Sequence, residues 1–297
     1  MNNEPVSEKE YIENEHSVKG RVLIIAALLI VCLALGLIMF KALAKPKITG
    51  VKSLVAANIR AQSKVKNYHM DGDVDMDITF DNEELQSLQA MFDLKLPVKM
   101  TLRADAGSES AHVITDAAMT IFGNTVQVQS SESYLDMKNM AVYSRSGESA
   151  QWKKSGDHAD QMGFKELLGG IAVAGKTVME NASFSETDDF YTLTMPAEKT
   201  GDIIKDLHLL DRVDLGIADV RDISVEGGQI VYNVDKTTLL VSSVDLVDVD
   251  CRGKGTYAEI SVDLRSMVNG SFVFSRYNEV EESKYLIPPE VIRLTEE

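Results

Sequence analysis

An uncharged apolar run, Val22 to Phe40, constrains this chain more than any other feature of its sequence. The run contains no proline and is bracketed by Arg21 and Lys41. In a helix it would span roughly 28 Å, close to the ~30 Å hydrocarbon core of a bilayer. A buried helix of a water-soluble domain normally keeps a polar stripe over such a length. The run therefore predicts one transmembrane helix.

Signal-peptide cleavage and lipid attachment are the two alternatives to an uncleaved anchor. Ala42-Leu43-Ala44 matches the small-residue pattern of a signal-peptide cleavage site, although the apolar run is longer than the core of a typical signal peptide. Lipid attachment at Cys32 would need a small residue just before it, where this chain has Val31. We expect the uncleaved, single-pass anchor.

The orientation of this anchor rests on two opposing arguments. More Lys and Arg residues flank the run on its carboxyl side than on its amino side, which favours a cytoplasmic body. Long domains, however, translocate largely regardless of charge. Together with the family resemblance below, this predicts a cytoplasmic polar tail at 1–21, a transmembrane helix at 22–40, a linker at 41–47 and an extracytoplasmic domain at 48–297.

The charge and the cysteines narrow the class of partner. The formal net charge is −16, nearly all of it after the apolar run, so we expect no nucleic-acid partner. The same sign predicts no general attraction to anionic lipid headgroups. Cys32 and Cys251 cannot pair if the anchor spans a membrane, and a body without disulfides is common in bacterial envelope proteins.

Hydrophobic periodicity predicts an α+β body. An amphipathic helix is expected over Ile48–Val65, and Tyr68–Phe80 then alternates apolar residues with aspartates, as in a strand with one face in water. Gly227-Gly228 predicts a hairpin turn. Further helices are expected over 81–92, 162–171 and 203–213, and residues 277–291 as coil. The other expected strands are 98–104, 111–122, 125–131, 133–137, 141–145, 151–154, 184–195, 223–226, 229–235, 239–250, 256–264 and 271–277.

The chain after the anchor resembles bacterial envelope proteins of the LolA/LppX-like lipoprotein-carrier fold. The segments that carry the resemblance are Lys66–Met70, the strand VDMDI, the paired strands QIVYNVDKTTLLVSSVDLVDVD and the ending FSRYNEVEESKYLIPPEVI. The resemblance implies a strongly curved antiparallel sheet, an unclosed barrel, with helices covering its apolar face. It also implies that a lipid or another apolar ligand lies between the sheet and the helices. This chain differs in having an apolar helix where a lipid-modified cysteine usually stands, so its body would stay tethered to one membrane.

The predicted function is therefore that of a membrane-anchored, extracytoplasmic binding protein, without enzymatic activity, cofactor or metal. Methionine's flexible thioether suits a surface that accepts varied apolar ligands, although ordinary core packing explains the same residues. An alternative is a structural or sensory envelope protein that binds a protein partner through the polar face of the sheet. The residues expected to line a ligand cavity are Met70, Val74, Met76, Ile78, Met100, Leu102, Leu167 and Leu207.

Two local motifs match catalytic or metal sites but are interpreted as coincidence. Gly170–Thr177 fits the phosphate-loop pattern, yet it lacks the preceding buried strand that such a loop needs. Asp73–Glu84 places acids at calcium-loop positions, but Ile78 stands where that loop needs glycine. The histidines are scattered without metal-ligand spacing, and we expect structural or exposed roles for them.

Overall fold

The computed structural model describes residues 47–80, 96–121, 124–147, 151–155, 171–200, 217–257 and 260–295. By its internal contacts the chain divides into Met1–Lys47 and a compact unit, Ile48–Glu297. The description that follows concerns this compact unit. Among the described residues, no helix has both the length and the apolar character that a membrane crossing requires. The run Val22–Phe40 lies outside them.

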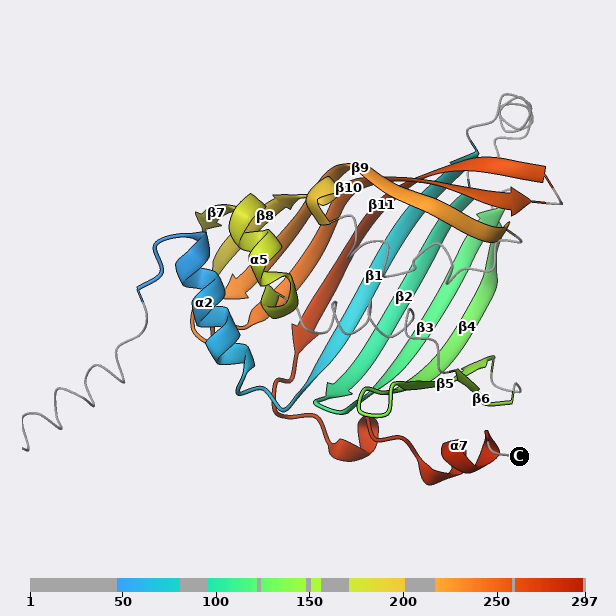
Figure 1. Cartoon of the computed structure of the whole chain (residues 1–297), viewed down its shortest axis with the longest axis horizontal. Helices are drawn as coiled ribbons and strands as arrows, with labels where there is room; N and C mark the ends of the chain where they lie inside the picture. The colour runs from blue at the N-terminus through green and yellow to red at the C-terminus, as the bar shows by residue number, and fades with distance from the viewer. Residues whose placement is uncertain are drawn as a thin grey trace, which may run out of the picture. The chain divides into compact units, whose positions relative to one another are not determined.

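Within the described residues, the strands form one antiparallel sheet of eleven strands (Figure 1). The strands are β1 (Asn67–Phe80), β2 (Leu96–Gly107), β3 (Ser110–Ile121), β4 (Asn124–Asp136), β5 (Ala141–Ser146), β6 (Lys153–Ser155), β7 (Ser183–Glu186), β8 (Phe190–Pro196), β9 (Ile217–Asp235), β10 (Val241–Tyr257) and β11 (Ile260–Ser275).

The order of the strands shows how the sheet is assembled. It runs β6-β5-β4-β3-β2-β1-β11-β10-β9-β8-β7, so neighbours in the sheet are neighbours in sequence at every position except one. The exception is the central pair of β1 and β11, which runs from His69 opposite Ser275 to Phe80 opposite Leu264. The sheet is curved, and its edges are β6 and β7, which do not pair with each other (Figure 1). The predicted curved, unclosed antiparallel sheet is confirmed.

β1 shows why the sheet has two unlike faces. Its burial alternates along the strand, with Met70, Val74 and Met76 buried and Asp71 and Asp73 exposed. Successive side chains of a strand point to opposite faces, so one face becomes apolar and the other meets water. We call the apolar face, on which α2 and α5 lie, the inner face, and the opposite face the outer face.

Helices α2 (Val51–Gln62) and α5 (Ile171–Asn181) contribute to the core of the inner face (Figure 1). Leu54 and Val55 of α2 and Val178 of α5 are fully buried in the same cluster as the strand residues. The predicted amphipathic helix over 48–65 is thus present over a shorter range. At its start the Ser53 hydroxyl accepts a hydrogen bond from the Gly50 N–H at 3.2 Å, satisfying a free donor of the first turn.

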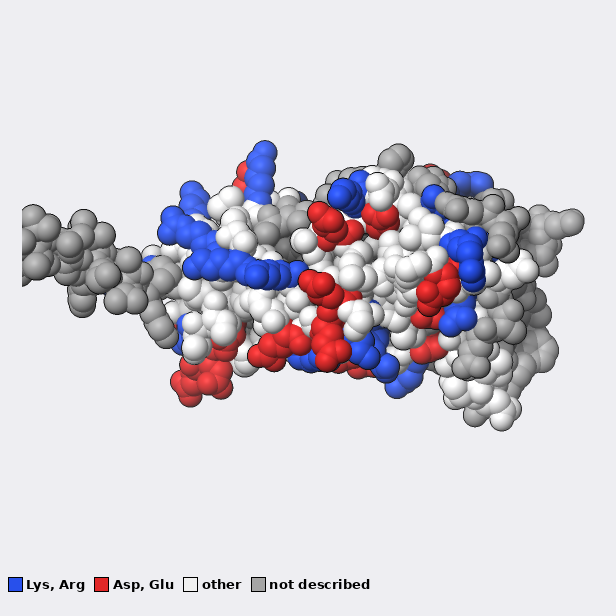
Figure 2. All heavy atoms as spheres, turned by 90° about the horizontal axis from the view of Figure 1, so that it is seen from below, with Lys and Arg blue, Asp and Glu red and all other residues white. Residues whose placement is uncertain are grey.

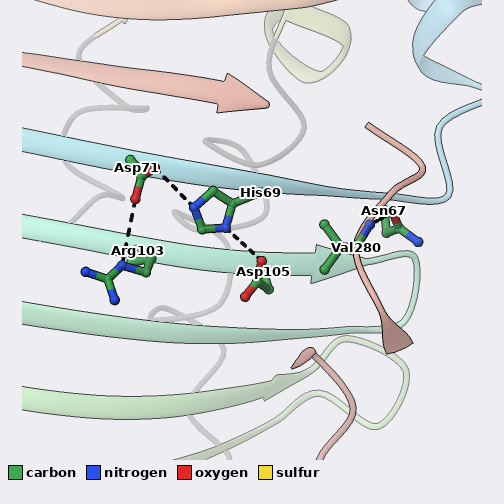
Figure 3. Close-up of polar contacts among 6 residues, drawn as sticks. All are labelled: Asn67, His69, Asp71, Arg103, Asp105 and Val280. Atoms are coloured by element: carbon green, nitrogen blue, oxygen red, sulfur yellow. Dashed lines mark hydrogen bonds and ion pairs between the residues drawn. The ribbon is translucent and has the colours of Figure 1, made fainter. Parts of the chain in front are cut away.

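The carboxyl-terminal segment packs against the outer face. It contains a short 3-10 helix, η2 (Glu282–Lys284), and the helix α7 (Pro289–Leu294), where a coil was expected. The Val280 N–H donates to the Asn67 side chain at 3.0 Å, which fixes this segment beside the start of β1 (Figure 3). Val291 of α7 then packs with Tyr134 and Tyr143 in a second, smaller core.

Several strand predictions were wrong at their ends or connections. Residues 223–235, expected as a hairpin around Gly227-Gly228, belong to one continuous strand, β9. Gly228 has a φ of +97° and lies at an irregularity in the pairing with β10, so the glycines form a bulge instead of a turn. The expected strand 184–195 is two strands, β7 and β8, with a 3-10 turn, η1 (Ala197–Thr200), after them.

Two neighbouring strands were also divided wrongly. β4 is a single strand where two were expected, over 125–131 and 133–137. The strand expected over 256–264 spans the end of β10 and the start of β11. The helix expected over 203–213 and the insert over 81–92 lie outside the described residues, as does the helix expected over 162–171 except for Ile171.

Candidate functional site

The inner face of β1 and β2 brings six of the eight predicted lining residues together. Met100 lies opposite Val74, and Leu102 lies opposite Gly72, in the pairing of the two strands. All six side chains are buried, and they are Met70, Val74, Met76, Ile78, Met100 and Leu102. The other two, Leu167 and Leu207, lie outside the described residues.

Methionine is concentrated on this inner face. Met119 of β3 lies opposite Val98, which itself lies opposite Met76, so these three form a row across adjacent strands. Met195 of β8 lies opposite Ile230 on the far side of the sheet and is fully buried. Unbranched thioether side chains can adopt several shapes at little cost, so this surface can adapt to irregular apolar groups.

The interior above the inner face has a low polarity. Burial raises the pKa of Tyr232 to about 12. Burial, reinforced by the neighbouring Asp250 carboxylate, raises the pKa of the Cys251 thiol to about 11. Both pKa values are raised because the exclusion of water disfavours the charged form of each group.

Two buried side-chain polar atoms, Asn58 Oδ1 and Ser266 Oγ, make no hydrogen bond among the described residues. Ser266 of β11 is 1% exposed and lies between Ile78 of β1 and Cys251 of β10 in the pairing. Its hydroxyl makes no hydrogen bond among the described residues. A buried hydroxyl without a partner is costly, and each such group calls for an explanation. Ser266 could offer a hydrogen bond to a polar group of a bound molecule.

The outer face carries two histidine–carboxylate clusters. In the first, the two ring nitrogens of His69 lie 2.7 Å from Asp105 Oδ1 and 3.1 Å from Asp71 Oδ2 (Figure 3). Arg103 lies 3.8 Å from the other Asp71 oxygen. The His69–Asp105 and Arg103–Asp71 pairs link β1 to β2 on the water-facing side.

The second cluster is centred on Glu132 of β4. Arg145 donates to Glu132 Oε2 from Nε at 2.8 Å, and His112 Nε2 lies 2.8 Å from Oε1. Burial raises the pKa of Glu132, but the hydrogen bonds from Arg145 and His112 outweigh it and the net pKa is lowered. The His112 ring also stacks on Tyr134 with centroids 4.4 Å apart. Both histidines thus have structural partners on the outer face.

The structure places the described parts of both local motifs in regular secondary structure. Residues 171–181 form α5, so Gly175, Lys176 and Thr177 lie within a helix and cannot wrap a phosphate as a loop does. Asp73, Asp75 and Asp77 lie along the extended strand β1, and the remaining part of the calcium pattern falls outside the described residues. Within the described part of the chain, no group of three metal-ligating side chains converges.

A family model matches residues 50–295, which is nearly the whole compact unit. The chain belongs to the family of unknown function DUF6612. No curated protein matches the sequence.

Several solved structures match the chain at low sequence identity. LprF from Mycobacterium bovis matches with 12% identity and a TM-score of 0.37, over 80% of this chain and 95% of that one. A LolA superfamily protein from Nitrosomonas europaea matches with 8% identity and a TM-score of 0.26, over 81% and 99%. A DUF1329 family protein from Desulfovibrio piger matches with 9% identity and a TM-score of 0.26, over 81% and 96%. The family resembled by the sequence is thus represented among the matching structures.

Three inner-face residues were not singled out from the sequence: Met119, Met195 and Ser266. The alternation of Val113, Ala117 and Met119 within an expected strand could have identified Met119. Nothing local marks Ser266, because its burial depends on the pairing of β11 with both β1 and β10.

Proposed function

We propose that this DUF6612 protein is a membrane-anchored, extracytoplasmic binding protein that holds a lipid or another apolar ligand. The ligand lies between the inner face of the sheet and the helices beside it. The observation that carries the proposal is the concentration of buried methionines on one face of one sheet, at Met70, Met76, Met100, Met119 and Met195. The buried Ser266 hydroxyl would add a polar contact to the ligand within this mainly apolar surface.

The proposed anchor is the run Val22–Phe40, which has the length and composition of a transmembrane helix. It keeps the binding unit at one membrane, so the protein presents or stores its ligand at that surface. No covalent chemistry is part of this function, and the outer-face histidines serve to hold strands together.

Met100 offers a test that separates a ligand cavity from a solid core. Its neighbours on the inner face are Val74 of β1 and Ala117 of β3. If a cavity lies above it, Met100→Trp fills the space, abolishes binding of a fluorescent apolar probe and leaves stability nearly unchanged. In a solid core the same change costs about 1–3 kcal/mol through overpacking. Met100→Leu is the matched control, since it conserves volume and should preserve both properties.

Binding is measured by titrating the compact unit with the probe, and stability by urea unfolding. The proposal fails if the wild-type unit binds no probe while Met100→Trp is strongly destabilised. That pair of results would describe a packed core without a site.

A second candidate function uses the outer face. Asp71, Asp73, Asp75 and Asp77 form an exposed acidic row along β1, suited to a protein partner in the envelope. Site-specific photo-crosslinking from Asp75 in cells, with no lipid bound to the purified protein, would favour this alternative.

A further inference from the structure

The segment around α2 has a charge opposite to that of the whole chain. Residues 47–66 contain five basic residues and no acidic residue, whereas the chain has a formal net charge of −16. The five are Lys47, Lys52, Arg60, Lys64 and Lys66. Within the described part of the chain, none of them takes part in an ion pair. Their charge is therefore available to a partner.

α2 divides these residues between two faces. Its buried positions, Leu54, Val55, Ala57 and Asn58, point to the core. The exposed positions are Lys52, Ala56, Ile59 and Arg60, at a spacing of four, three and one residues. Positions with this spacing lie on one side of a helix. Ile59, 41% exposed, is thus a large apolar side chain within a cationic stripe.

α5 continues this surface beside α2. A Cβ added to Gly175 would lie 3.6 Å from Val55 and 3.7 Å from Ile59, so the two helices pack closely there. Met179 follows Gly175 by one helical turn and is 38% exposed. Lys176 is exposed beside it, and Glu180 is the opposing charge on the described part of α5. Figure 2 shows Lys and Arg side chains on one part of the end of the unit that holds α2, with Asp and Glu side chains on an adjoining part.

An exposed apolar pair within a cationic helical surface has the composition of a membrane-surface site. Lys and Arg attract anionic headgroups, and apolar side chains insert at the boundary of the acyl chains. The acidic charge elsewhere on the unit does not cancel this attraction, because salt screens charges beyond ~8 Å. The attraction of this surface to anionic headgroups therefore depends on its local charge, and not on the net charge of the chain.

The position of α2 in the chain favours the same partner. α2 begins at Val51, and ten residues, 41–50, separate it from the end of the apolar run at Phe40. Ten residues span at most roughly 35 Å when fully extended. With the run inserted in a bilayer, α2 is held within reach of the headgroups of that same membrane.

We propose that Lys52, Ile59 and Arg60 of α2, with Lys176 and Met179 of α5, dock onto the anionic lipid headgroups of the membrane that holds the anchor. We call these five residues the α2–α5 surface. The interaction gives the compact unit a second, reversible membrane contact and a fixed orientation. It does not require the inner face to hold a ligand.

The test places an environment-sensitive fluorophore on the α2–α5 surface of the full chain. Ile59→Cys and Met179→Cys are labelled in a Cys32→Ser background; Cys251 is buried and so protected from the label. The labelled proteins are reconstituted in vesicles of phosphatidylcholine alone and of phosphatidylcholine with phosphatidylglycerol. Val273→Cys is the control, because Val273 is 48% exposed on the outer face.

We expect a blue shift, and quenching by a lipid-borne quencher, at the two labelled helix positions in the anionic vesicles only. High salt should remove both signals, and the control position should show neither. Lys52→Glu with Arg60→Glu should weaken the contact roughly fivefold for each cation lost. The matched reversals Lys138→Glu and Lys254→Glu, at exposed cations elsewhere, should leave it unchanged.

Three results would overturn the docking. They are equal emission in both kinds of vesicle, an equal shift at the control position, or a shift that survives the Lys52 and Arg60 reversals. An acidic protein as the true partner would give the first result. Probe binding at the inner face is measured separately, so either proposal can fail while the other holds.

Discussion

The unpaired hydroxyl of Ser266 gives a prediction about stability that also bears on function. In the ligand-free compact unit, Ser266→Ala removes a polar group that is buried and that makes no hydrogen bond with any residue the structure describes. Leaving such a group unsatisfied costs about 1–3 kcal/mol. Its removal should therefore raise the free energy of unfolding by about 1 kcal/mol, after the loss of some packing around the oxygen.

Ser271→Ala on the same strand is the matched control. The Ser271 hydroxyl donates to Asp245 Oδ1 at 2.5 Å on the outer face. A hydrogen bond to a charged group contributes about 1.5–3 kcal/mol, of which solvent at this partly exposed site screens a part. We expect Ser271→Ala to lower the free energy of unfolding by about 1 kcal/mol, opposite in sign to Ser266→Ala.

The assay is urea unfolding, followed by tyrosine and tryptophan fluorescence, on delipidated protein and on protein as isolated from cells. If a bound ligand forms a hydrogen bond with Ser266, the free energy of unfolding of the wild type should rise relative to that of Ser266→Ala in the sample as isolated from cells. A loss of stability for Ser266→Ala in delipidated protein, equal to that of Ser271→Ala, would refute the reasoning. It would mean that the hydroxyl has a partner within the protein.

Three further predictions concern the bulge, the outer face and the buried thiol. In urea unfolding, Gly228→Ala should lower the free energy of unfolding by about 3 kcal/mol, because the added Cβ would lie 2.5 Å from Val249 Cα at a φ of +97°. The control Gly227→Ala should leave the free energy of unfolding nearly unchanged. Glu132→Gln should cost roughly 1–2 kcal/mol by weakening the charged hydrogen bonds. Because the folded-state pKa of Glu132 is lowered, this difference should be present above its ordinary value of 4.5 and disappear as pH falls through the folded pKa, as unfolding at several pH values would show. Cys251, with a pKa raised to about 11, should react with a thiol reagent far more slowly in the folded protein than in urea, in a variant whose other cysteine is serine. No pH dependence for Glu132→Gln, or equal thiol rates in both states, would contradict the respective account.

Much of the sheet could be predicted from the sequence because its faces are so unlike. The alternation in residues 68–80 predicted β1 to within one residue, since each aspartate faces water and each apolar residue faces the core. The same signal placed Met70, Met76 and Met100 on one face. Local periodicity is enough wherever a strand is buried on one side only.

Other features depend on contacts distant in sequence. Gly227-Gly228 has the composition of a turn, but β9 pairs with β10 both before and after these glycines, and this pairing keeps β9 extended. No local sequence signal predicts the pairing of β1 with β11, which, together with the pairing of β10 with β11, accounts for the burial of Ser266. The membrane-facing role proposed for α2 was hidden because the net charge of the chain is opposite to the charge of that segment.

Native mass spectrometry of the compact unit, purified from cells without detergent, tests the binding of an apolar ligand most directly. The account predicts a mass adduct that dissociates as a lipid or another apolar molecule. It also predicts that the adduct persists in Met100→Leu and is absent from Met100→Trp. A wild-type unit that carries no adduct, and that takes up none when offered lipid vesicles, would contradict the account.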